Sequence, residues 1–167
     1  KEAKGLIIPG GFPEQYAEQI SNSKKSLTSI KSFIGKYPVY AECGGMLLLG
    51  ESLFDLEGKE YSMAGVLPFK AKRGNLKIGY RELSGIAKSP IIEPGDKLIG
   101  HEFHHWRIEM QKNSLKINKL WETEGWDIDR IKEGFCNSFL HASWIHLHWA
   151  SSPIILRNWM KALKTNV

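Results

Sequence analysis

Two short apolar runs with a helical stretch between them constrain the fold of this chain most strongly. GLIIPGG (5–11) has the pattern of a buried strand that ends in a double-glycine turn, and YPVYAE (37–42) has the pattern of another strand. Between them, Pro13 suits the start of a helix, the pattern breaks at residues 21–26, and Gly35 is placed to end the second helical stretch. A strand, a helical crossover and a second strand predict a parallel sheet with a right-handed connection.

The remaining segments predict a mixture of helix and extended chain. GMLLLGESL (45–53) predicts a helix, and residues 61–110 predict extended segments with a turn at EPGD (93–96). FLHASWIHLHWA (139–150) predicts one strand, and residues 152–153 predict the start of a last amphipathic helix. The sequence therefore predicts a single α/β domain.

Composition narrows the class of protein. The chain has 167 residues, 42% of them hydrophobic and 25% charged, which suffices for one globular domain with its own core. Two cysteines, Cys43 and Cys136, are too few for a disulfide framework and predict a reducing, cytoplasmic location. No apolar run reaches membrane-spanning length, so no membrane partner is predicted. The net charge of +5 is scattered along the chain, which favours a lysine-rich surface over an anionic partner and predicts no nucleic-acid binding.

The junction Glu42-Cys43-Gly44-Gly45 places a thiol between a predicted strand and a predicted helix. A side chain at such a tight turn projects from the carboxyl edge of the sheet, the device that hydrolases with a G-x-S-x-G turn use for serine. The glycines leave room for a strained backbone, and the helix N-terminus would favour a thiolate. The N–H of Gly44 would face an oxyanion. These features predict that Cys43 is a nucleophile; the alternative is a small buried hydrophobic residue.

A cysteine nucleophile needs a base, and histidines are the candidates. If residues 139–150 form one strand, His146 and His148 share a face of it. Such an H-x-H pair can also bind a metal, with His101 or His104 as a third ligand. Because Glu102 is the one carboxylate near these histidines in the sequence, the signal is weak and no metal site is predicted.

Five segments, in the order in which they occur in the chain, resemble one known family: IIPGGFPE, YAECGGMLLLGESL, GYREL, GHEFHHWR and ASWIHLHWAS. Taken together, these segments make the chain similar, over nearly its whole length, to the glutamine amidotransferase domains of the cobyric-acid-synthase type. Among these domains, it resembles in particular those of cobyrinic acid a,c-diamide synthases. The resemblance implies an α/β fold of the class I amidotransferase kind, a flavodoxin-like parallel-sheet sandwich with added antiparallel strands.

The resemblance also implies roles for individual residues. Cys43 attacks the side-chain amide of glutamine, and His146 takes and returns the proton. The oxyanion rests on the N–H of Gly44 and on the Gly10-Gly11 turn. Related domains carry a glutamate two residues after the histidine, where this chain has His148, so a dyad without an acidic orienting group is expected.

Four histidines are left without a role, and two tryptophans depart from the family pattern. Trp144 and Trp149 replace the Tyr and Phe that are usual there and are expected to stay away from the chemistry. The histidines without a role are His101, His104, His105 and His148.

Partners follow from the same resemblance. Ammonia released from glutamine would pass to an ATP-dependent synthetase domain that amidates the a and c side chains of a corrinoid acid. No G-x-x-x-x-G-K-[ST] loop is present, so ATP and Mg²⁺ are expected in that other domain, and no cofactor is expected here. The alternatives are a sister amidotransferase that acts on cobyric acid or a cell-wall lipid precursor, and an inactive fragment that docks a synthetase.

Residues 1–167 are expected to be a partial amidotransferase domain. Class I domains begin with a strand and a helix before the Gly-Gly turn, whereas here one strand precedes Gly10-Gly11. A missing first βα unit would leave an open sheet edge, which predicts low stability, association of two copies as a homodimer, and weak or no glutaminase activity of residues 1–167 alone.

Overall fold

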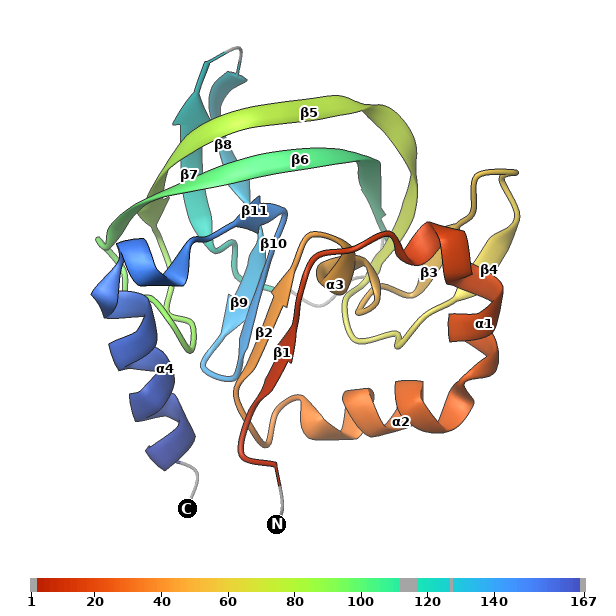
Figure 1. Cartoon of the computed structure of the whole chain (residues 1–167), viewed down its shortest axis with the longest axis horizontal. Coiled ribbons are helices and arrows are strands. Elements are labelled where there is room, and N and C mark those ends of the chain that lie inside the picture. The colour runs from red at the N-terminus through yellow and green to blue at the C-terminus, as the bar shows by residue number, and fades with distance from the viewer. Residues whose placement is uncertain (1–2, 112–116, 127, 166–167) are drawn as a thin grey trace.

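The computed structural model describes residues 3–111, 117–126 and 128–165. Its centre is a four-stranded sheet in which β1, β2 and β10 run parallel and β9 runs antiparallel to β10 (Figure 1). The predicted parallel sheet is thereby confirmed. Within the described residues, β1 is an edge strand that pairs with β2 alone, and the missing βα unit and the homodimer stay predictions. The strands, in spatial order, are β1 (Leu6–Ile8), β2 (Val39–Glu42), β10 (Leu140–Ser143) and β9 (Phe135–Asn137).

The connection from β1 to β2 is helical, as the sequence predicts. It consists of η1 (Pro13–Tyr16), α1 (Ala17–Asn22) and α2 (Lys24–Phe33). The break falls at Ser23, inside the predicted interruption. Gly35 follows α2 with a φ of 91°, a conformation that glycine adopts without strain and that turns the chain back towards β2.

Alternate residues of β2 face different helices. Val39 and Ala41 are fully buried in a core that also contains residues of α1 and α2. Tyr40 points the other way, into a second core with residues of α4 (Pro153–Thr165). The central sheet is therefore covered on one face by α1 and α2 and on the other by α4 (Figure 1).

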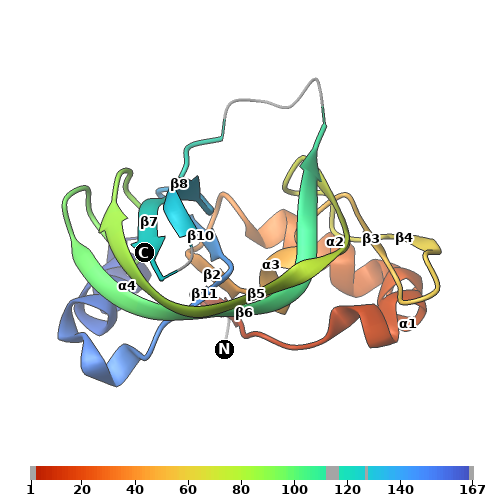
Figure 2. The same ribbon diagram turned by 90° about the horizontal axis from the view of Figure 1, so that it is seen from above.

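A second sheet arches over the carboxyl ends of the central strands. Its longest members, β5 and β6, form a curved ribbon that passes across the molecule (Figure 2). The connection between them contains Gly95, with a φ of 91°, inside the predicted EPGD turn. The strands of this sheet are β3 (Ser52–Phe54), β4 (Glu60–Ser62), β5 (Phe69–Gly85), β6 (Lys97–Met110), β7 (Trp121–Gly125), β8 (Ile128–Glu133) and β11 (Ile145–His146).

The helix predicted over residues 45–53 is wrong beyond its first turn. The helix α3 spans only Gly44–Leu47, and the chain then enters β3. Leu49 and Leu53 are fully buried, so the run is apolar because it crosses the core. A continuous apolar run has no periodicity that distinguishes a helix from a buried extended segment.

The single strand predicted over residues 139–150 is also wrong. Strand β10 ends at Ser143, and after Trp144 the chain continues as β11, which pairs with β6 of the other sheet. The Trp144 N–H donates to Oε1 of Glu133 at 2.8 Å. A buried carboxylate thus satisfies a backbone group where a continuous strand would have used a neighbouring strand. The chain then forms the short helix η2 (Trp149–Ser151).

Glu133 also makes stability depend on pH. It is buried and accepts a second hydrogen bond from Oγ of Ser143 at 2.7 Å. Burial raises the pKa of its carboxyl to about 7, although both hydrogen bonds oppose that shift. Because this folded value exceeds the ordinary 4.5, the stability that the group contributes is complete below pH 4.5 and is lost as the pH rises through about 7.

We expect Glu133→Gln to remove most of that dependence, because a neutral amide keeps an acceptor and has no charge to bury. Between pH 5 and pH 8 the melting temperature of the unsubstituted protein should fall by roughly 5 °C or more on this account. The fall should be clearly smaller in the variant. Glu57→Gln, which changes an exposed carboxylate, is the matched control. An identical fall in the Glu133 variant would contradict the prediction.

Candidate active site

Cys43 occupies a strained turn between β2 and α3. Its φ of 49° and ψ of −111° make it the one non-glycine residue with positive φ in the described part of the chain. Such a conformation costs about 1–3 kcal/mol and persists only where the surroundings impose it. Here the N–H of Cys43 donates to the carbonyl of Ser143 at 2.7 Å, which anchors the turn to β10. The predicted strand-to-helix turn is therefore present at this cysteine.

The glycines of the two turns are in direct contact. A Cβ at Gly44 would overlap the carbonyl of Gly11, and one at Gly45 would overlap the carbonyl of Ile8. A Cβ at Gly10 would lie 2.6 Å from Cε1 of His146. The turn after β1 thus packs closely against both the cysteine turn and the histidine. The N–H of Gly44, at the start of α3, has no carbonyl partner within that helix.

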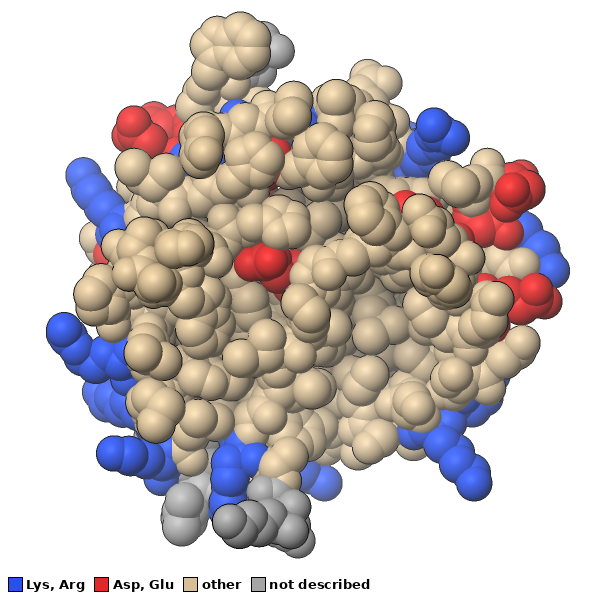
Figure 3. Space-filling view, in the orientation of Figure 1, with Lys and Arg blue, Asp and Glu red and all other residues tan. Residues whose placement is uncertain are grey.

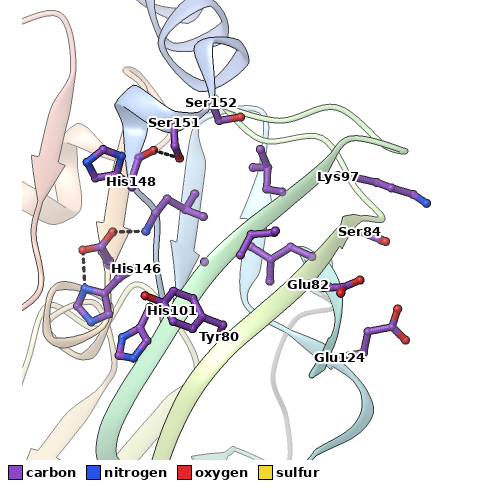
Figure 4. Close-up of a pocket in the computed structure, with 16 residues that line it drawn as sticks. Tyr80, Glu82, Ser84, Lys97, His101, Glu124, His146, His148, Ser151 and Ser152 are labelled. Carbon is purple, nitrogen blue, oxygen red and sulfur yellow. Dashed lines mark hydrogen bonds and ion pairs between the residues drawn. The ribbon is translucent and has the colours of Figure 1, made fainter. Parts of the chain in front are cut away.

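His146 lies beside Cys43 and is held by a carboxylate. Its Nδ1 is 2.8 Å from Oε1 of Glu42, the last residue of β2 (Figure 4). The other oxygen of Glu42 accepts from the N–H of Leu147 at 3.1 Å and from the hydroxyl of Tyr40 at 2.5 Å. The expectation of a dyad without an acidic orienting group is therefore wrong. The carboxylate comes from the residue directly before Cys43, because β2 and the chain after β10 end at the same sheet edge.

The charges at this pair reinforce one another. Hydrogen bonding with Cys43, and then with Glu42, raises the pKa of His146 to about 10, against the effect of burial. Burial works against ionisation of Glu42, but the bonds from His146, Tyr40 and Leu147 outweigh it and hold the pKa of that carboxyl below its usual value. With Nδ1 bound to Glu42, Nε2 is the ring nitrogen available to the sulfur. At neutral pH the pair is an imidazolium and a carboxylate.

Cys43 opens into a small cavity, called here the nucleophile cavity. Its Sγ is 3.6 Å from the carbonyl oxygen of Phe103 on β6. Trp144 also lines the cavity, whereas Trp149 lies elsewhere, edge-on to Tyr40; that neither residue touches the chemistry stays a prediction. The side chains that line the cavity include those of Phe12, Glu14, Phe103, His104, His105 and Trp144.

A buried ion network supports one wall of the nucleophile cavity. Glu102 accepts from Nε of Arg81 at 2.7 Å and lies 2.9 Å from Nε2 of His104. Nδ1 of His104 lies 2.7 Å from the carbonyl of Trp106, and its ring stacks on Trp144 with centroids 3.8 Å apart. Burial disfavours ionisation of Glu102, but the bonds from His104 and Arg81 outweigh it and lower the pKa of its carboxyl. His104 therefore has a structural position.

A larger cleft of about 1120 Å³ adjoins the site from another side. Glu42 and His146 line it together with His101 and His148 (Figure 4). His148 is exposed and points away from the pair, since β11 ends at His146. Of the predicted site residues, Cys43, His146 and the three glycines come together, and His148 does not.

Few charged side chains appear in the middle of the face seen in Figure 3. Lys and Arg side chains on the face seen in Figure 3 lie mainly along its edges. Among the described residues, no three His, Cys, Asp or Glu side chains gather as metal ligands.

No helix in the described ranges has the length and apolarity needed to cross a bilayer.

Sequence reasoning missed Glu42 and Glu14. Glu42 could have been found from its place before Cys43, since the ends of parallel strands meet at one edge. Glu14 gave no periodic signal, because it stands in a short 3-10 helix. Its burial in the nucleophile cavity depends on the packing of β6 over that helix.

Comparison with known proteins gives a consistent set of similarities. A family profile described as "CobB/CobQ-like glutamine amidotransferase domain" matches residues 1–154. A cobyrinate a,c-diamide synthase of Synechococcus sp. is 33% identical over 165 residues, which cover 95% of this chain and 35% of the relative. A hydrogenobyrinate a,c-diamide synthase of Mycobacterium bovis is 32% identical over 150 residues, which cover 89% and 31%. The chain thus spans about a third of the length of these relatives.

The fold is shared with solved structures. A glutamine amidotransferase from Thermotoga maritima matches with a TM-score of 0.57 at 15% identity, covering 98% of this chain and 64% of that one. The class I amidotransferase-like fold that the sequence predicts is therefore confirmed.

Proposed function

This chain belongs to the CobB/CobQ-like glutamine amidotransferase family, and we propose that it releases ammonia from glutamine with Cys43 as nucleophile and His146 as base and acid. The observation that carries this proposal is the strained turn at Cys43 beside the His146–Glu42 pair. Nucleophile, base and orienting carboxylate then form a triad, in which each group is held by the next.

The chemistry of the first half-reaction follows from these positions. With the proton of the Cys43 thiol held on Nε2 of the His146 imidazolium, the sulfur forms a bond to the side-chain carbonyl carbon of glutamine. The negative oxygen faces the N–H groups of Gly44 and Gly11. The tetrahedral intermediate collapses as its C–N bond breaks, and His146 gives its proton to the departing nitrogen. Ammonia leaves, and the glutamyl group remains on sulfur as a thioester.

Water completes the cycle. His146 takes a proton from the water as its oxygen bonds to the thioester carbon, and the C–S bond then breaks. Glutamate leaves, and the proton stays on His146, which restores the starting state of the site. Glu42 keeps the imidazole in the tautomer with Nδ1–H and stabilises the imidazolium in both halves, so it is a positioning residue.

For the whole protein we propose the activity that its relatives' names give. Ammonia would pass to an ATP- and Mg²⁺-dependent synthetase domain that amidates the a and c carboxylates of cobyrinic or hydrogenobyrinic acid. Both described cysteines are free, which fits the cytoplasm as the proposed location. A sister amidotransferase with another acceptor and an inactive docking fragment are the alternatives.

A glutaminase assay tests the proposal. The chain should convert glutamine to glutamate and ammonia, alone or when supplied with the synthetase part of a relative. With that part, ATP, Mg²⁺ and a corrinoid acid, amidated product should appear. Hydrolysis that feeds amidation only of cobyric acid or a lipid precursor would select the sister activity. No hydrolysis under any of these conditions would select the docking fragment.

Glu42→Gln should slow glutamine hydrolysis by about 10- to 100-fold, the value of one charged hydrogen bond. Since Glu42 raises the pKa of His146, its loss lowers that pKa from about 10, and the alkaline limb of the pH–rate profile should move to lower pH. The measurement is kcat/KM from pH 6 to pH 10. Glu51→Gln, an exposed carboxylate eight residues downstream of Cys43, should leave rate and profile unchanged. A slower variant with an unmoved profile would contradict the positioning role.

A further inference from the structure

Glu14 is a largely buried acidic residue without a protein partner among the described residues. The residue is only 9% exposed, and within the described residues its side chain makes no hydrogen bond or ion pair. The other buried acids in the described chain are all paired: Glu102 with Arg81 and His104, and Glu133 with Ser143 and Trp144. The oxygens of Glu14 are not among the fully buried polar atoms that lack a partner, so this carboxylate is open to a ligand.

The position of Glu14 indicates which ligand that is. It lines the nucleophile cavity together with Cys43 and Gly44. His104 faces the same cavity, but both of its ring nitrogens are engaged, with Glu102 and with the carbonyl of Trp106. A cation that enters beside Cys43 is therefore the partner that Glu14 lacks.

We propose that Glu14 binds the α-ammonium group of glutamine while the side-chain amide of the same molecule lies at Cys43. This inference rests on the proposed function and adds to it the residue that makes the site specific for an amino acid. The ammonium supplies the positive charge and the hydrogen-bond donors that the buried carboxylate lacks. The imidazole of His105, which lines the same cavity, can donate to the α-carboxylate. Glu14 and His105 thus offer complementary groups for both ends of a zwitterion, and the cavity, about 50 Å³ in this structure, has to widen to take up the whole molecule.

Two substrates isolate this contact. L-Glutamine and 4-carbamoylbutanoate share the amide and the carboxylate, but the second lacks the ammonium. Glu14→Gln should lower kcat/KM for glutamine by about 10- to 100-fold, mainly through KM, and change that for 4-carbamoylbutanoate by less than about 3-fold. Glu18→Gln, an exposed carboxylate one turn further on, should change neither.

Thermal unfolding without substrate separates a ligand role from a structural one. Because Glu14 makes no hydrogen bond or ion pair within the described residues, Glu14→Gln should melt at about the same temperature as the unsubstituted protein. A lower melting temperature together with equal losses on both substrates would overturn the assignment and make Glu14 a structural residue.

The outcomes also distinguish a failure of the role of Glu14 from a failure of the proposed glutaminase function. An unsubstituted protein that hydrolyses glutamine, with a Glu14 variant that loses both substrates equally, would contradict the role of Glu14 alone. The proposed function, and the role of Glu14 with it, would be contradicted by two results together. The unsubstituted protein would not hydrolyse glutamine, and glutamine would not raise the melting temperature of the Cys43→Ser variant.

Discussion

Cys43→Ser should abolish glutamine hydrolysis, with a loss of more than about 10³-fold. The positive φ at Cys43 and the close contact of Gly44 with Gly11 fix the backbone of the turn, so the variant keeps the geometry of the site. It lacks only a sulfur that ionises in reach of His146, and a serine hydroxyl is a far weaker nucleophile at neutral pH. The measurement is glutamate formation by the purified variant. In a complete synthase, amidation from added ammonia should survive, because that site is separate.

Cys136 provides the matched control for this prediction. Cys136 lies on β9 and is buried, with 1% of its surface exposed. Its Sγ lies 3.7 Å from the carbonyl oxygen of Lys119, and burial raises the pKa of its thiol to about 11. Cys136→Ala should therefore keep glutamine hydrolysis, and a thiol reagent should modify Cys43 first, as peptide mass spectrometry would detect. Near-normal turnover by the Cys43→Ser variant would show that the nucleophile lies elsewhere.

His146→Ala should slow hydrolysis by about 10²–10⁴-fold, the contribution of a positioned proton-transfer group. The variant leaves the Glu42 carboxylate partly buried without its cation, so some of the loss comes from that group as well. Because the side chain of His146 is 36% exposed towards the large cleft, free imidazole in the buffer can reach the space it leaves. Added imidazole should restore part of the rate in His146→Ala and none in Cys43→Ser.

His148→Ala is the control for that experiment. It removes an exposed imidazole two residues along the chain, outside β11 and pointing away from His146 (Figure 4). Its rate should equal that of the unsubstituted protein. A loss in His148→Ala as large as that in His146→Ala would reverse the choice of base.

The parts of the fold that the sequence predicts are those fixed by local chemistry. Pro13, Gly35 and the Gly95 turn act on their own neighbours, and the two strands that flank the helical crossover have short buried runs. The run after Cys43 was mistaken for a helix because nearly every position from residue 44 to residue 50 is buried, which removes periodicity. The bend at Trp144 depends on Glu133, a distant residue whose carboxylate replaces a strand neighbour.

Some residues of the candidate site could be predicted from the sequence, and others could not. Cys43 and the glycines around it are visible in the sequence, because a tight strand-to-helix turn demands small residues. His146 and His148 were separated by the family pattern, and the end of β11 supplies the physical reason. The contact of Glu42 with His146 joins residues 104 positions apart, and sequence spacing carries no information about such a pair.

That separation has a consequence for how the enzyme folds. The pairing of β2 with β10, which brings Glu42 opposite Ser143, closes a loop of about a hundred residues before it gains any contact. Parallel, non-local pairing of this kind is slow to form, typically on a millisecond-to-second scale. On the ribosome, the turn with Cys43 emerges long before β10 and His146 are synthesised. The nascent chain therefore carries its reactive thiol without a base until synthesis is nearly complete, so the thiol gains its catalytic partner only in the folded protein.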